Sequence, residues 1–233
     1  MADALLRAAP LIHEDFILSA CDNLVSKEDV GGMLALWQSA PKPEGVLALM
    51  EVPTEKIKSV GIVELHGDRI RHIIEKPDPS EVSGNIASMP LYMFSKRILD
   101  YLPEVPLSPR GEYELQDAIQ LLIERDGGVR GYRISGRLTL TSPADLLALN
   151  RYYLTNGNAN HHAQPQQVGV NSKLIPPIHI ESGVVIGANC EIGPNVYIER
   201  DCQIGDGANV SDSVLLRGVR VPTGTQIVGQ VIS

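Results

Sequence analysis

The sequence predicts an α/β domain followed by a short parallel β-helix, and three observations lead to this prediction. Two continuous apolar runs, residues 16–21 and 45–50, are typical of strands that are covered on both faces in a parallel sheet. Segments with apolar residues at helical spacing alternate with such runs up to about residue 150. From Ile180 onward, apolar residues recur every six positions, which fits neither a helix nor an ordinary strand.

Three helices are expected in the first region. Ser26, with Asp29 three residues later, can cap the first helix, and Pro41 stops it. One face of this helix is expected to be buried, and it carries Val30, Met33, Leu34 and Trp37. The second helix is expected over residues 112–124. The third begins at Ser142, an N-cap candidate that is followed by proline at the first helical position.

A polar segment rich in Asn, Gln, His and Gly separates the two regions. We therefore expect a first domain at residues 1–154, a linker at residues 155–172 and a β-helix at residues 173–233. His161 and His162 lie in this linker, where paired histidines are interpreted as solvated rather than as a metal site.

The C-terminal domain is defined by its six-residue repeat. One position of each hexad carries a large apolar residue: Ile180, Ile186, Ile192, Ile198, Ile204, Val210 and Leu216. Four places after each of the first six stands Val184, Cys190, Val196, Cys202, Ala208 and Val214. This resembles the hexapeptide repeat of left-handed parallel β-helices, over residues 174–230 and about three coils, with both positions pointing inward. The register slips by one residue between Val210 and Val221, so an irregular corner is expected there.

Two functions are open for such a β-helix. Some hexapeptide proteins catalyse acyl transfer with a histidine between coils. His179 is the one histidine of these repeats, and it lies at their start. An acyltransferase is therefore the least favoured hypothesis. A structural role in oligomerisation or regulation is favoured.

Composition excludes other classes of function. The net charge is −8, whereas nucleic-acid binding depends on clustered Lys and Arg. No stretch approaches the roughly 20 apolar residues of a membrane span, and residues 1–10 lack the order of a secretion signal. We expect a cytoplasmic protein without a membrane or nucleic-acid partner. Cys21, Cys190 and Cys202 form no CxxC pair, so neither a disulfide framework nor a zinc site is predicted.

Several segments of the first region occur in a characteristic order. They are the apolar run that ends in Asp22, followed by residues 60–65, 75–77, 91–95 and 108–119. In this order and spacing the chain resembles the sugar-1-phosphate nucleotidylyltransferase family, in particular glucose-1-phosphate thymidylyl- and uridylyltransferases with a C-terminal hexapeptide domain. The resemblance covers residues 2–150 and implies an incomplete Rossmann-like nucleotidyltransferase domain.

The family resemblance implies a role for four residues. In the family, the sugar phosphate attacks the α-phosphate of dTTP or UTP and expels pyrophosphate, which requires a divalent metal and basic groups. The candidate catalytic residues are Asp22, as the first carboxylate that binds Mg²⁺, and Lys76, which would contact the sugar phosphate. Glu75 would hydrogen-bond to sugar hydroxyls, and Asn85 would lie near the sugar.

The residues themselves leave simpler interpretations open. An Asp at the carboxyl end of a strand faces the crevice where open α/β sheets bind ligands, but Asp22 is also an ordinary turn residue. A lysine at a strand end, such as Lys76, is ordinarily solvated.

Two departures from the family lower the expected activity. The family's glycine-rich loop, G-G-x-G-T-R-L, would precede Met1, so we expect an N-terminally truncated or degenerate homologue. Thr139 stands where the family pattern W-x-D-x-G-T-P has the second metal-binding Asp, which removes one negative charge. We therefore expect weak or no nucleotidyl transfer, with a sugar 1-phosphate and a nucleoside triphosphate as the family's ligands. The alternative is a non-catalytic regulatory or assembly subunit, which would associate with further copies of itself or with a complete paralogue.

Overall fold

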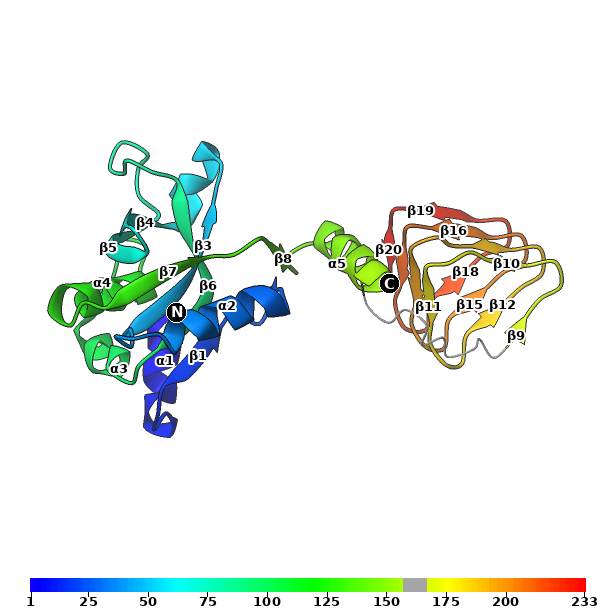
Figure 1. Cartoon of the computed structure of the whole chain (residues 1–233). Coiled ribbons are helices and arrows are strands. Elements are labelled where there is room, and N and C mark those ends of the chain that lie inside the picture. The colour runs from blue at the N-terminus through cyan, green and yellow to red at the C-terminus, as the bar shows by residue number, and fades with distance from the viewer. Residues whose placement is uncertain (157–166) are drawn as a thin grey trace. The chain divides into compact units, whose positions relative to one another are not determined.

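The computed structural model describes residues 1–156 and 167–233, which form two compact units, Met1–Arg137 and Leu138–Ser233 (Figure 1). His161, His162 and most of the expected linker lie outside the described residues. In the described part of the chain, no helix is long and apolar enough to cross a membrane.

A six-stranded sheet forms the centre of the first unit, in the order β1-β6-β3-β7-β5-β4. β3 runs parallel to β7, whereas its other neighbour, β6, is antiparallel to it. The strands of this sheet are β1 (Phe16–Ser19), β3 (Gly45–Glu51), β4 (Gly61–His66), β5 (Arg69–Glu75), β6 (Ile86–Phe94) and β7 (Val129–Arg133). Two further short strands are β2 (Asn23–Val25) and β8 (Arg137–Thr139).

The expectation of a parallel sheet is wrong for residues 16–21. β1 pairs antiparallel with β6 and is the end strand of the sheet, so its residues alternate between half-buried and exposed. Ile17 is 56% exposed. The expectation for residues 45–50 is confirmed as to burial, since β3 is central and Gly45–Leu49 are all buried.

Two helices cover opposite faces of this sheet. α4 (Leu115–Arg125) shares a core with Leu47 and Leu49, whereas α2 (Lys27–Trp37) shares a core with Val46 and Ala48. Because successive residues of a strand face opposite sides, the two cores lie on the two faces of β3. The remaining helices of this unit are α1 (Ala2–Ala8) and α3 (Ile98–Tyr101), with short 3-10 helices at Ala9–Leu11, Thr54–Ser59 and Leu102–Glu104.

The predicted helix caps are present. The Ser26 hydroxyl accepts a hydrogen bond from the Asp29 N–H at 3.1 Å, and α2 begins at the next residue. Met33 is fully buried, but Leu34 is 42% exposed, so the predicted apolar face of α2 was too wide by that residue. In the second unit, the Ser142 hydroxyl accepts from the Asp145 N–H at 3.2 Å at the start of α5 (Pro143–Asn156).

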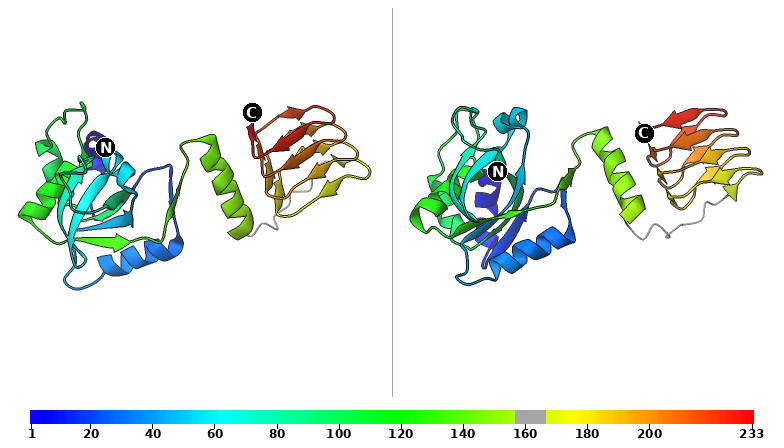
Figure 2. Two further views of the ribbon diagram at one scale, coloured as in Figure 1. Left: turned by 90° about the horizontal axis from the view of Figure 1, so that it is seen from above. Right: turned by 45° about the horizontal axis from the view of Figure 1, so that its top comes forward.

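Residues 167–233 form a parallel-strand solenoid of about four coils, one more than expected (Figure 2). Each coil contributes one strand to each of three four-stranded parallel sheets. The first sheet contains β9 (Gln167–Val168), β12 (Val185–Ile186), β15 (Gln203–Ile204) and β18 (Arg220–Val221). The second contains β10 (Lys173–Leu174), β13 (Glu191–Ile192), β16 (Asn209–Ser211) and β19 (Gln226–Val228). The third contains β11 (Ile178–Ile180), β14 (Val196–Ile198), β17 (Val214–Leu215) and β20 (Val231–Ile232).

The six-residue repeat fills the interior of the solenoid. The predicted inward residues from Ile180 to Val214 are all buried. Glu191 pairs with Asn209, but Tyr197 pairs with Val214, so one residue is missing from the coil after Asn209. This confirms the predicted slip in register. It also means that Leu215 is fully buried in place of Leu216, which is half-buried.

Candidate functional site

Glu75 and Lys76 lie together where β5 ends. Lys76 has a left-handed backbone conformation, with φ +49°, and its N–H donates to the Val60 carbonyl at 3.0 Å. The Lys76 ammonium lies 3.7 Å from Oε1 of Glu75. The Glu75 side chain is only 11% exposed and that of Lys76 is 32% exposed. The loop thus holds a nearly buried carboxylate beside an ammonium that solvent and ligands can reach.

A glycine makes room for the Glu75 carboxylate. Gly61 of β4 pairs in register with Glu75 on one side and with Ser88 of β6 on the other. A Cβ atom at position 61 would lie 2.9 Å from Oε2 of Glu75 and 3.1 Å from Cγ of Gln116, so any larger residue would displace the carboxylate.

One polar atom in this row of the sheet has no partner. Oε2 of Glu75 is buried and makes no hydrogen bond within the described residues. A buried polar atom without a partner costs free energy, and such atoms in proteins usually meet a ligand or an ordered water. The Glu75 oxygen is therefore a candidate acceptor for a ligand hydroxyl.

A second carboxylate raises the charge density at this site. Burial, followed by repulsion from Glu114, raises the pKa of Glu75, while Lys76 and Arg110 act in the opposite direction. Nη2 of Arg110 donates to Oε1 of Glu114 at 2.9 Å. Burial and the Glu114 charge also raise the pKa of Asp117. The residues at the start of α4 therefore add negative charge near Glu75, which Arg110 partly neutralises.

The other predicted site residues belong to other segments of the chain than this pair. Asp22 is exposed in the turn between β1 and β2. Nδ2 of Asn85 donates to the Val52 carbonyl at 3.0 Å, which leaves its side-chain oxygen available. Neither residue shares a hydrogen bond or ion pair with Glu75 or Lys76 in the part of the chain that the structure describes. Thr139 ends β8 in the second unit.

The residues present do not fit a magnesium site with two carboxylates. Among residues 1–156 and 167–233, no group of three or more His, Cys, Asp or Glu side chains could hold a metal ion. Asp22 is a single exposed carboxylate, and the Thr139 hydroxyl is a neutral and weaker ligand than the carboxylates that Mg²⁺ prefers. Asp22 as a metal ligand stays a prediction.

Sequence reasoning did not single out three neighbours of Glu75. Gly61, Glu114 and Gln116 surround its carboxylate, although they belong to another strand and to the start of α4. One signal was available, because a glycine inside an apolar strand often marks a close approach of another group.

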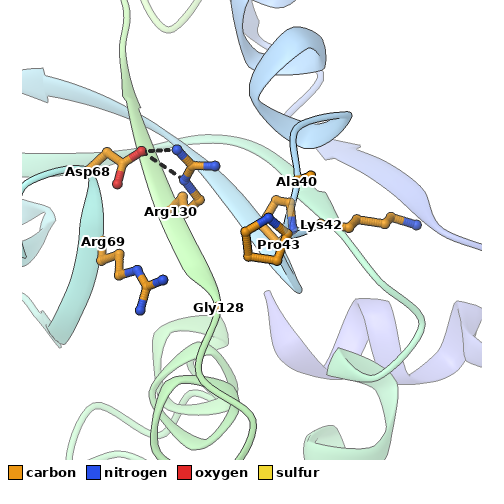
Figure 3. A pocket seen from close by; sticks show the side chains of 8 residues that line it. Ala40, Lys42, Pro43, Asp68, Arg69, Gly128 and Arg130 are labelled. Carbon is orange, nitrogen blue, oxygen red and sulfur yellow. Dashed lines mark hydrogen bonds and ion pairs between the residues drawn. The ribbon is translucent and has the colours of Figure 1, made fainter.

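A cavity of about 210 Å³ lies at the opposite end of β5, beside Arg69 (Figure 3). Nε of Arg130 donates to Asp68 at 2.8 Å and its Nη1 donates to the Ser39 hydroxyl at 2.6 Å, so this arginine is already paired. Lys42 pairs with Asp15. The cavity is lined by Ala40, Pro41, Lys42, Pro43, Asp68, Arg69, Gly128 and Arg130, none of which is a predicted site residue.

Comparison with known proteins identifies the family. Residues 1–134, more than half of the chain, match the family described as nucleotidyl transferase. The chain belongs to the nucleotidyl transferase family. Residues 174–233 match the family described as the GMPPB C-terminal domain, which covers most of the solenoid.

The names of two curated relatives of this nucleotidyl transferase family member refer to glycan biosynthesis and to glucose 1-phosphate. The low-salt glycan biosynthesis nucleotidyltransferase Agl11 of Haloferax volcanii is 32% identical over 142 residues, covering 60% of this chain and 38% of that protein. The UTP–glucose-1-phosphate uridylyltransferase of Haemophilus influenzae is 28% identical, covering 58% of this chain and 50% of that protein. The bifunctional protein GlmU of Methanococcus maripaludis is 28% identical, covering 78% of this chain and 42% of that protein. The chain thus spans half or less of the length of these relatives.

Solved structures support the fold. UDP-glucose pyrophosphorylase complexed with UDP-glucose superposes with a TM-score of 0.58 at 23% identity, covering 66% of this chain and 62% of that one. The UTP-bound UGPase from Acinetobacter baumannii gives a TM-score of 0.57 at 24% identity, covering 67% and 57%. At this level of identity the likeness shows a shared nucleotidyltransferase fold.

Proposed function

We propose that this chain binds a sugar 1-phosphate at Glu75 and Lys76, as a member of a nucleotidyl transferase family that forms nucleotide sugars from UTP or dTTP. The observation that carries the proposal is the buried Oε2 of Glu75, which has no hydrogen-bond partner in the described part of the chain and lies beside a lysine. A sugar hydroxyl would satisfy the carboxylate, and Lys76 would neutralise the phosphate of the same ligand.

The chemistry of this family requires little of the protein beyond positioning and charge. Displacement of pyrophosphate by the sugar phosphate proceeds when two anions are held in line and the developing charge is neutralised. Thr139 contributes no charge at the place of the second family carboxylate. We therefore propose that nucleotidyl transfer by this chain is weak or absent, while binding of the sugar phosphate is retained.

Calorimetric titration with glucose 1-phosphate tests the binding. We expect Glu75→Gln and Lys76→Ala each to weaken it by roughly tenfold or more, because each removes a charged hydrogen-bonding group. Lys27→Ala is the matched control, since the Lys27 side chain is 92% exposed on α2. Binding that is equally strong in the Lys27, Lys76 and Glu75 variants would refute the site. Rapid pyrophosphate release from UTP or dTTP in the presence of glucose 1-phosphate and Mg²⁺ would refute the proposal of weak turnover.

One observation favours a role as a regulatory or assembly subunit as a second candidate. β1 is an end strand with Ile17 exposed, and exposed apolar edge strands promote pairing with another chain. Light scattering and co-purification with a complete paralogue test this role. A monomer at every concentration that captures no paralogue would exclude it.

A cytoplasmic location is part of the proposal. Cys21, Cys190 and Cys202 are all free, and free thiols are the rule in reducing compartments.

A further inference from the structure

Arg137 occupies the place where the chain departs from its family. Thr139 stands at the position of the second metal-binding Asp in the W-x-D-x-G-T-P pattern, and Arg137 therefore stands at the position of the aromatic residue. Over three residues the segment has lost a negative charge and gained a positive one. The change in sign favours an anion where the family pattern favours a cation.

The guanidinium of Arg137 is anchored next to Asp22. Its Nη1 donates to Oδ1 of Asn23 at 3.3 Å, and Asn23 directly follows Asp22. Nδ2 of Asn23 is buried and has no hydrogen-bond partner among the described residues. Two donors, one charged and one neutral, thus lie together beside the turn that carries Asp22.

The charge of Arg137 is not neutralised by the protein. Arg137 is half-buried, yet it forms no ion pair with any carboxylate in residues 1–156 and 167–233. By contrast, Arg110, Arg125 and Arg130 are each held by an acidic side chain. A half-buried guanidinium without a carboxylate is free to bind an external anion, and its planar fork matches the oxygens of a phosphate.

The charges of Arg137 and Glu75 both act on one buried hydroxyl, that of Tyr92. Burial is the main reason that the pKa of Tyr92 rises to about 12; a side-chain hydrogen bond with Ser88 opposes the rise, the Glu75 charge adds to it and the Arg137 charge lowers it. Both charges are thus within electrostatic reach of Tyr92. Glu75 and Arg137 therefore share one electrostatic environment around Tyr92.

We propose that the Arg137 guanidinium, anchored on Asn23 beside Asp22, binds the phosphate of a sugar phosphate directly, so that this chain holds its ligand without a divalent cation. The proposal rests on the proposed function for the identity of the sugar phosphate. Arg137 would supply positive charge two residues before Thr139, where the family pattern has a cation-binding carboxylate.

The test is titration of the purified chain with glucose 1-phosphate and, separately, with inorganic pyrophosphate, in excess EDTA and in millimolar Mg²⁺. We expect the affinity for glucose 1-phosphate to agree within about threefold in the two buffers. Arg137→Gln should weaken binding of both probes roughly tenfold to a hundredfold. Binding by Arg137→Lys should be intermediate between the wild type and Arg137→Gln, because lysine keeps the positive charge but lacks the planar guanidinium. Arg71→Gln is the control, because Arg71 is an exposed arginine of β5 that has no ion pair among the described residues either. Circular dichroism melts confirm that each variant is folded.

The outcomes separate this inference from the proposed function. The role of Arg137 is overturned if binding requires Mg²⁺. It is also overturned if the Arg137→Gln and Arg71→Gln variants bind equally strongly, even where Glu75→Gln still weakens binding of glucose 1-phosphate. Binding of pyrophosphate that depends on Arg137, without any binding of glucose 1-phosphate, overturns the proposed function and leaves the phosphate site at Arg137. Failure to bind either probe in EDTA overturns the inference.

Discussion

The Glu75 carboxylate lies in an environment that is unfavourable in the unliganded protein and suited to binding a ligand. One of its oxygens is buried without a partner, and the neighbouring Glu114 carries the same charge. Groups of this kind lower stability and are retained where binding needs them. The structure therefore predicts a conflict between stability and binding at this position.

Replacing Glu75 by Gln should stabilise the unliganded protein by about 1 kcal/mol at neutral pH while it weakens sugar-phosphate binding. Because folding raises the pKa of Glu75 above its ordinary 4.5, the charged form is penalised in the folded state. The penalty is complete above the folded pKa and disappears as the pH falls below 4.5, where both states are protonated. Urea unfolding at about pH 7 and about pH 4 measures the difference, with Glu55→Gln, an exposed glutamate, as the control. A variant that is less stable than the wild type at neutral pH would contradict this reasoning.

The sequence identifies some of these residues and misses others for a physical reason. Glu75 and Lys76 are predicted as site residues because they stand together in one short motif. Gly61 and Glu114 are not, because it is the pairing register of β4 with β5 and the packing of α4 that bring them to the carboxylate. Such contacts depend on the assembled fold and leave no local pattern.

At the scale of elements, the hydrophobic periodicity predicts structure correctly where the repeat is short and local. The hexads predicted the inward residues of the solenoid and even the slip after Asn209, because each coil repeats the same short turn. An apolar run such as residues 16–21 carries no such information about its neighbours. It predicts a parallel strand, whereas β1 is an antiparallel edge strand.

The turns of the solenoid should differ sharply in their tolerance of a side chain. Gly193 and Gly218 both have positive φ, but a Cβ at Gly193 would overlap the Ile175 carbonyl oxygen, whereas nothing lies within 4 Å of one at Gly218. We expect Gly218→Ala to destabilise the solenoid by about 1 kcal/mol through backbone strain alone. Gly193→Ala should cost about 3 kcal/mol or more, because backbone must move. Thermal melts that rank the two variants equally would show that the coil relaxes around the new methyl group.

At the scale of the whole chain, the buried residues fall into separate cores. Two clusters lie on the faces of the six-stranded sheet, and a third fills the solenoid without sharing a residue with them. The sequence predicted this division into an α/β unit and a β-helix, because the hydrophobic period changes between them. The handedness of the solenoid and the assembly of the chain stay predictions.

Separate cores should give separate unfolding transitions in calorimetry. Cooperative unfolding requires shared buried surface, and a solenoid unfolds through contacts between adjacent coils. Ile119, in the core beneath α4, and Ile198, inside the solenoid, are both fully buried, so replacing either by Ala should remove about 2–4 kcal/mol. Each substitution should lower one transition and leave the other within experimental error, since distant sites in different cores act independently. A single transition that both variants shift by the same amount would show that the two units stabilise each other, and the site at Glu75 would then have to be treated as part of one cooperative structure.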